Sequence, residues 1–348
     1  MFDYTAVAAK CRAMAGNLLT PGDYAALASC KSVGDIAEYL GRTQNYGDYF
    51  AAALRGGITR SRVEYAVKSA QLNDSLRILT FSSGRGRDYM RLLLAKYENE
   101  LLLNIWHSIG APNSPSPGRP GETSLNIKAL SAIDSSIDAA KLVAAGEASD
   151  AGLFLEALSG TAYRDIFSRD IPGGSGAIIE TEIFKKYYFD LHEKAGDFAA
   201  SDAAAIREAV GARADFINIM RIYRLTRNFG MEPSLLPAYY IPVGYKLKRD
   251  DIAALAATGD SQGFAAAISQ TYYGRRSPFT AGESLTAYAD GFTHSLMRRR
   301  MHGGAGGFAL AVYYFFMRQE ETESIVRITE GVRYGMEPGA ILRGLPGA

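Results

Sequence analysis

The sequence predicts an all-α protein made of three similar helical subdomains related by pseudo-threefold symmetry. Two observations predict it. Apolar residues recur at three- and four-residue steps along long stretches, whereas the alternation typical of strands is scarce. In addition, short markers recur at intervals of about a third of the 348-residue chain, which indicates three copies of one unit.

The repeated markers are of three kinds. A threonine followed by a tyrosine closes a helix-like run at three places: Leu40–Tyr46, Leu158–Tyr163 and Ile268–Tyr273. An Asn-Ile or Ser-Ile pair occurs at 104–105, 218–219 and 324–325. The most specific marker is Phe229-Gly230-Met231-Glu232-Pro233, which recurs as Tyr334-Gly335-Met336-Glu337-Pro338. Units of this length exceed solenoid repeats, so we expect small helical subdomains that dock on their neighbours.

Breaks rich in proline and glycine divide the units. Residues 110–121 contain four prolines and three glycines, which predicts a linker at the end of the first unit. A second break at 231–244 separates the second unit from the third. We therefore expect units at 1–119, 120–236 and 237–348. Residues 171–176 are expected to form a loop within the second unit, and residues 303–307 to interrupt a helical hairpin in the third.

The helices are expected in order along the chain. Residues 89–106 predict a mostly buried helix of about five turns, and alanine-rich 138–141 and 251–257 favour helix by propensity. Residues 215–227 predict a helix with two unlike faces. One face carries Phe216, Ile219, Met220 and Tyr223, and the other carries Arg221, Arg224 and Arg227.

Composition limits the classes of function. With 47% hydrophobic residues the chain can bury a substantial core, and a net charge of +1 gives no bulk attraction to nucleic acid or an anionic membrane. Cys11 and Cys30 are too few for a disulfide scaffold, which fits a reducing compartment. The amino terminus lacks the pattern of a signal peptide. The longest apolar run, 308–317, is half the length of about 20 residues that a membrane span needs, so no direct span is expected.

Catalytic and cofactor motifs are scarce in the sequence. The four histidines are dispersed without metal-ligand spacing, and neither a phosphate-binding loop motif nor G-x-S-x-G occurs. We therefore expect no catalytic residues, cofactor or metal. The acidic run Glu320, Glu321 and Glu323 is interpreted as a helix start or a solvated helix face.

Arginines are the candidate partner-contact residues. Arg298, Arg299 and Arg300 predict either a surface patch for an acidic partner or a solvated helix face. Arg221, Arg224, Arg227 and Arg327 follow the Asn-Ile or Ser-Ile marker at similar places. If the units pack around an axis, these arginines line one binding wall for another helix; alternatively they solubilise the outer helix faces.

The order of these markers resembles the C/d subunit of V-type and A-type rotary ATPases over essentially the whole chain. The opening Arg12–Met14 with Leu18-Leu19 and the segment from Asp35 to Tyr46 fit this family. Asp215–Arg221 resembles its acidic-x-x-Asn-Ile-x-Arg pattern, and Glu321–Arg327 echoes it. The pair at 104–105 departs from the pattern, because it lacks both the acidic residue and the arginine.

The resemblance implies a funnel-shaped, non-catalytic component on the cytoplasmic face of a membrane. Its wide end is expected to rest on the proteolipid ring, and its cavity to accept the central shaft made by the D and F subunits. ATP hydrolysis belongs to other components of such a complex. Two alternatives stay open: a generic all-helical adaptor unrelated to rotary motors, and an enzyme with a cryptic active site.

Overall fold

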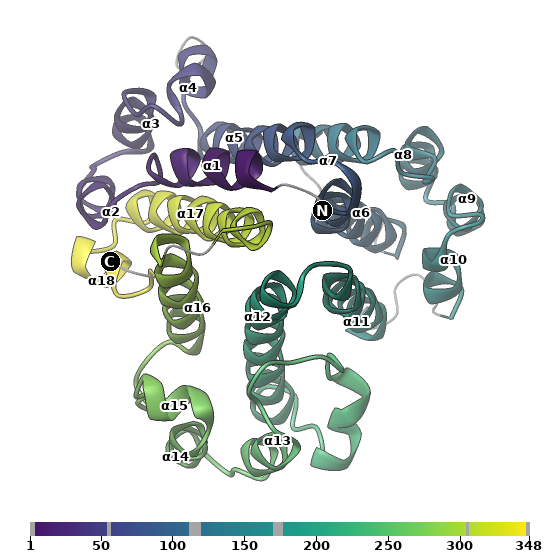
Figure 1. Cartoon of the computed structure of the whole chain (residues 1–348), viewed down its shortest axis with the longest axis vertical. Coiled ribbons are helices and arrows are strands. Elements are labelled where there is room, and N and C mark those ends of the chain that lie inside the picture. Colours follow the sequence, from purple (N-terminus) through teal and green to yellow (C-terminus); the bar gives the residue numbers. More distant parts are fainter. Residues whose placement is uncertain (1–3, 54–56, 111–119, 170–176, 304–305, 346–348) are drawn as a thin grey trace.

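Helices are the regular elements of this protein throughout the part of the chain that its computed structural model describes, residues 4–53, 57–110, 120–169, 177–303 and 306–345 (Figure 1). The all-α prediction is therefore confirmed. The predicted linker at 110–121 and loop at 171–176 lie mostly or wholly outside the described residues. The pseudo-threefold funnel and the unit boundaries stay predictions.

Trios of short helices alternate with pairs of long helices along the chain. The trios are α2 (Pro21–Ala28), α3 (Val33–Gly41) and α4 (Gly47–Ala53); α8 (Ala139–Ala148), α9 (Ala151–Ala157) and α10 (Ala162–Phe167); and α13 (Arg249–Ala256), α14 (Ser261–Gln270) and α15 (Tyr272–Arg276). The pairs are α5 (Arg60–Phe81) and α6 (Gly84–Gly110), α11 (Ala177–Lys194) and α12 (Ala200–Arg227), and α16 (Leu285–His302) and α17 (Ala309–Arg333).

The remaining elements connect or flank these groups. They are α1 (Thr5–Ala15), α7 (Pro120–Ala132), α18 (Pro338–Leu342) and the 3-10 helices η2 (Ala195–Asp197) and η3 (Pro233–Tyr239). The break predicted at 303–307 is confirmed, because it separates α16 from α17.

Local signals explain where many helices begin and end. At the start of α2, Thr20 accepts a hydrogen bond from the N–H of Asp23, and the Asp23 carboxylate accepts one from the N–H of Thr20 at 2.7 Å. Side chains of Ser32, Asp138 and Asp260 cap α3, α8 and α14 in a similar way.

The repeated five-residue marker follows the end of one helix and begins the next. Gly230 and Gly335, just past the ends of α12 and α17, have φ of 60° and 66°, a left-handed conformation that favours glycine. The glutamate and proline that follow each glycine begin the next short helix, η3 or α18, with proline in its first turn. Sequence identity at this marker therefore reflects a shared backbone requirement.

Three long helices each contribute to two hydrophobic cores. The amino-terminal halves of α6, α12 and α17 meet in one central cluster, in which residues 308–317 are all buried. Their carboxy-terminal halves enter three separate outer clusters: α17 packs with the first trio, α6 with the second and α12 with the third. We call each outer cluster with its trio a lobe. The first, second and third lobes (α2–α4, α8–α10 and α13–α15) lie at separate places around the rim of the molecule in Figure 1.

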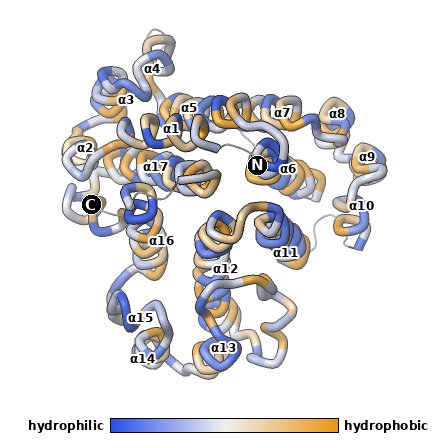
Figure 2. Tube along the Cα trace, viewed as in Figure 1, coloured by the Kyte–Doolittle hydropathy of each residue, from blue (hydrophilic) through white to orange (hydrophobic). Residues whose placement is uncertain are grey.

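Each trio thus packs on the long helix that precedes it in the chain, and the first trio packs on the last long helix, α17. This arrangement brings α2 and the last helix, α18, together in the first lobe. Hydrophilic and hydrophobic residues are interleaved along the long helices in Figure 2, and among the described residues no helix is long and apolar enough to cross a membrane.

Candidate functional site

A buried carboxylate on each of α6, α12 and α17 fastens the lobe that packs there. In the third lobe this residue is Asp215, which is only 1% exposed. Its Oδ2 accepts hydrogen bonds from the backbone N–H groups of Tyr245, Lys246 and Leu247 at 2.9, 2.7 and 2.9 Å. The same oxygen accepts one from the hydroxyl of Tyr273 at 2.5 Å. Asp215 therefore holds both the loop that enters α13 and the helix α15.

Glu321 on α17 does the same for the first lobe. Its Oε2 accepts a hydrogen bond at 2.5 Å from the N–H of Leu19, which lies in the turn before α2. Its Oε1 accepts one at 2.7 Å from the hydroxyl of Tyr46, just before α4. Because both contacts repeat the pattern of Asp215, we call such an arrangement a carboxylate–tyrosine clasp.

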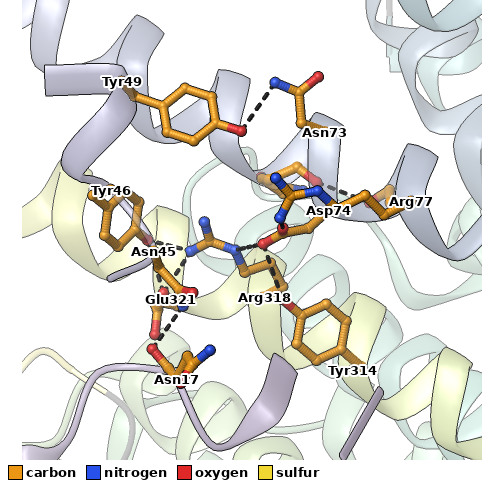
Figure 3. A network of polar contacts seen from close by, with 12 residues as sticks. Asn17, Asn45, Tyr46, Tyr49, Asn73, Asp74, Arg77, Tyr314, Arg318 and Glu321 are labelled. Carbon is orange, nitrogen blue, oxygen red and sulfur yellow. Dashed lines mark hydrogen bonds and ion pairs between the residues drawn. The ribbon is translucent and has the colours of Figure 1, made fainter. Parts of the chain in front are cut away.

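The clasp of the first lobe continues into a buried ion network (Figure 3). Arg318, which is 0% exposed, donates to Glu321 Oε1 from Nη1 at 2.5 Å and to Asp74 Oδ2 from Nε at 2.9 Å. The hydroxyl of Tyr314 donates to the same Asp74 oxygen at 2.9 Å. Nη1 also donates to the hydroxyl of Tyr46, so one guanidinium group joins α17, α5 and the first lobe.

The clasp of the second lobe is displaced along its helix. The side chain of Ser135, in the loop before α8, lies near Glu98 on α6 and acts to lower the pKa of its carboxyl. The hydroxyl of Tyr163 lies 3.3 Å from Glu98 Oε2 and 2.8 Å from Asn99 Oδ1. This carboxylate stands six residues before the Asn-Ile pair, whereas Asp215 and Glu321 stand three before theirs. A one-turn shift therefore explains why the acidic residue is absent from the expected place in the first unit.

The threonine marker positions each tyrosine. In all three copies the threonine hydroxyl donates to the carbonyl three residues before it: Thr43 to Leu40 at 2.7 Å, Thr161 to Leu158 at 2.8 Å and Thr271 to Ile268 at 2.7 Å. This bond closes the turn after the second helix of the trio, and the tyrosine follows it. The sequence marker is thus half of the clasp, and the carboxylate is the other half.

Burial governs the protonation of the clasps. It raises the pKa of Asp215, Glu321 and Glu98 above the ordinary carboxyl range, against the opposing effect of the hydrogen bonds that each receives. Burial also raises the pKa of Tyr46 and Tyr273, so each tyrosine keeps its proton and acts as a donor.

The interpretation of the acidic run 320–323 as a helix start or solvated face is wrong for two of its three residues. Glu320 and Glu321 are each 3% exposed and lie in the middle of α17. Glu320 accepts hydrogen bonds from Arg213 Nη1 at 3.1 Å and Thr293 Oγ1 at 3.0 Å. Acidic residues are tolerated there because α17 passes through the middle of the fold, where each finds cationic or hydroxyl donors.

Several of the predicted partner-contact arginines bind within the chain. Arg221 Nη1 donates to the carbonyl of Tyr239 at 3.1 Å, and Arg327 Nη1 lies 2.7 Å from Asp290 Oδ2. Arg227 Nη2 donates to the carbonyls of Thr258 and Asp260 at 2.9 and 2.7 Å. Arg300 forms a two-bond contact with Glu208 at 2.8 and 3.0 Å. Arg221 and Arg227 therefore hold a 3-10 helix end and a loop, whereas Arg300 and Arg327 join neighbouring long helices.

Arg224, Arg298 and Arg299 differ from these four. All three are exposed, and they make no hydrogen bond or ion pair with any residue that the structure describes. Arg224 lines a cavity of about 510 Å³ beside Leu285, at the start of α16, whereas Arg298 and Arg299 lie near the end of the same helix. The seven arginines are therefore not brought into one wall.

The geometry defines a class of protein: an all-helical scaffold whose lobes are fastened to long, centrally packed helices by buried carboxylates. Within the described residues no group of three or more His, Cys, Asp or Glu side chains is placed to hold a metal ion. Residues 7–344 match the family described as ATP synthase (C/AC39) subunit. The chain belongs to this family of rotary ATPase components, and the predicted membership is confirmed.

A relative supports the same assignment over a shorter stretch. The C subunit of the A-type ATP synthase of Methanosarcina mazei is 32% identical over 101 residues. That alignment covers 29% of this chain and 28% of the relative, so it spans less than a third of either protein.

Proposed function

We propose that this chain is a non-catalytic central-stalk component of a V/A-type rotary ATPase. It couples the rotary shaft, made of the D and F subunits, to the proteolipid ring of the membrane sector during ion transport or ATP synthesis. It acts on the cytoplasmic face as a peripheral member of the complex. One observation carries the proposal: the family match extends over residues 7–344, and so includes the central cluster and all three lobes.

The mechanical requirements of this role agree with the packing. A coupler must transmit torque between two surfaces without deforming, and it needs no reactive group. Each of α6, α12 and α17 runs from the central cluster into one lobe, so a force on a lobe reaches the centre through one continuous helix. The clasps and the Arg318 network oppose rotation of a lobe about its helix.

Arg224, Arg298 and Arg299 are the arginines that remain for contacts with partners. They are exposed and unpaired within the described chain, so a partner carboxylate does not have to displace an existing bond. With a net charge of only +1, such contacts depend on local patches and not on bulk attraction.

The test is recovery of partners from the native membrane. An affinity-tagged chain is expressed in its own host, the membranes are extracted in mild detergent, and the eluted proteins are identified by mass spectrometry. We expect shaft proteins and proteolipid in the eluate. Their absence, with the chain itself recovered folded, would contradict the coupling role.

A further inference from the structure

A cationic pit lies between the third lobe and the end of α16. It has a volume of about 260 Å³, and its walls include Glu208 from α12, Tyr245 from the loop before α13, Tyr272 and Arg276 from α15, and Arg299 and Arg300 from α16. The pit is smaller than a typical cavity for a drug-sized ligand, about 300 to 1,000 Å³. It therefore suits one or two side chains.

The charges in the pit do not balance. Three guanidinium groups line it together with one carboxylate, Glu208. Both oxygens of Glu208 are already engaged, because Oε2 accepts from Arg300 Nε at 2.8 Å and Oε1 accepts from Arg300 Nη2 and the Tyr245 hydroxyl, each at 3.0 Å. Arg276 and Arg299 make no hydrogen bond or ion pair with any described residue. Two positive charges are thus left without a partner among the described residues.

Aromatic rings hold part of this charge in position. The guanidinium of Arg276 lies 4.7 Å from the ring centre of Tyr272, and Lys246 Nζ lies 4.8 Å from that of Tyr245. The two tyrosine rings meet edge to face, with centres 6.0 Å apart and an angle of 86°. The contact with Tyr272 orients the Arg276 guanidinium before any ligand arrives, which lowers the entropy lost on binding.

We infer that this pit binds a carboxylate-bearing segment of a partner protein, through Arg276 and Arg299. The planar fork of arginine matches a carboxylate with two parallel hydrogen bonds, and Arg300 already holds Glu208 in this way inside the same pit. The tyrosine rings accommodate the methylene groups that carry an acidic side chain.

Other anions fit the pit less well. Arginine side chains also bind phosphate, but many phosphate sites add backbone N–H groups at a helix start, whereas the arginines of this pit lie near helix ends. Nucleic acid and anionic membranes attract extended basic surfaces, and this chain carries a net charge of +1. The inference goes beyond the proposed function, because it holds for any complex in which the chain takes part.

The test measures binding of a fluorescent acidic peptide, rich in Glu and Asp, to the purified full-length chain by anisotropy at low salt. Arg276→Glu and Arg299→Glu should each weaken binding about tenfold or more, the effect of removing a charge-assisted pair. Arg87→Glu is the control, because it makes the same charge change on an exposed residue near the start of α6, outside the pit lining. We expect it to weaken binding less than about twofold.

Further controls decide between the outcomes. Circular dichroism and thermal melting establish that each variant is folded, and Arg299→Lys should fall between wild type and Arg299→Glu because it keeps the charge but loses the fork. Equal weakening by Arg87→Glu overturns the inference. So does equal affinity for the acidic peptide and for a peptide in which Gln and Asn replace Glu and Asp. Binding of inorganic phosphate or phosphatidylserine vesicles with the same variant dependence, in place of the peptide, also overturns it. These measurements use the isolated chain, so their failure is distinct from failure of the pull-down that tests the rotary role.

Discussion

Replacing Asp215 with alanine should release the third lobe from α12. Four hydrogen bonds end on its Oδ2, three from backbone N–H groups and one from Tyr273. A hydrogen bond to a charged group contributes about 1.5 to 3 kcal/mol. The cost of burying the carboxylate, which raises its pKa, offsets part of this, and water can reach some of the freed donors. At about 1 kcal/mol for each bond, the loss in free energy of unfolding is about 4 kcal/mol.

Two measurements check this value and its location. Urea unfolding gives the global loss, and amide hydrogen exchange at residues 245–247 reports whether the loop before α13 has lost protection. Asp150→Ala is the control, because this exposed helix cap accepts bonds from Gly152 and Leu153 and should cost only about 1 kcal/mol. A loss for Asp215→Ala no larger than the control, or unchanged exchange at 245–247, would refute the reasoning.

Three further predictions concern packing and charge. Arg318→Leu leaves the buried carboxylates of Asp74 and Glu321 without their shared cation. The free energy of unfolding, measured by urea titration, should fall by about 3 to 5 kcal/mol. A fall of less than about 1 kcal/mol would contradict the stabilising role of this network. Gly211→Ala should lower the melting temperature of the protein, because the new Cβ would lie 2.7 Å from the backbone of Gly244. Gly291→Ala is the control and should raise the melting temperature, because nothing lies within 4 Å of its new Cβ and alanine favours helix. Equal effects of the two variants would show that α12 is not closely packed at Gly211. Burial raises the pKa of Glu98, so the folded chain holds this proton to higher pH than the unfolded chain, whose pKa is about 4.3. The stabilising contribution of the protonated Glu98 carboxyl is largest below the unfolded pKa and is lost as pH rises through the folded pKa. Wild type should therefore lose stability relative to Glu98→Gln as pH rises from acidic to neutral. Paired melting curves in which wild type instead gains stability over this range would disprove the prediction.

Local signals made the helices and the repeat predictable. Capping side chains, apolar periodicity and the left-handed glycine of the five-residue marker act within a few residues, so their effects follow from the sequence near them. The three threonine markers were also visible, because the same short hydrogen bond is needed in each copy.

The carboxylate half of each clasp was not predictable from periodicity. Tyr46 and Glu321 are 275 residues apart, and they meet only because the first trio packs on the last long helix. In the second lobe the one-turn shift to Glu98 removes even the repeated spacing. The arginines posed a similar problem, since an arginine that binds a distant carbonyl, such as Arg221, has the same helical spacing as one that faces solvent, such as Arg224.

Removing the chain from its complex tests its central role most directly. Membrane vesicles are prepared from a host that lacks the chain, and ATP hydrolysis and ATP-driven ion uptake are measured together before and after purified chain is added back. If the chain joins shaft to ring, vesicles without it should take up no ions while any ATP hydrolysis that remains is uncoupled, and added chain should restore uptake. Full ATP-driven ion uptake in vesicles without the chain would contradict the account.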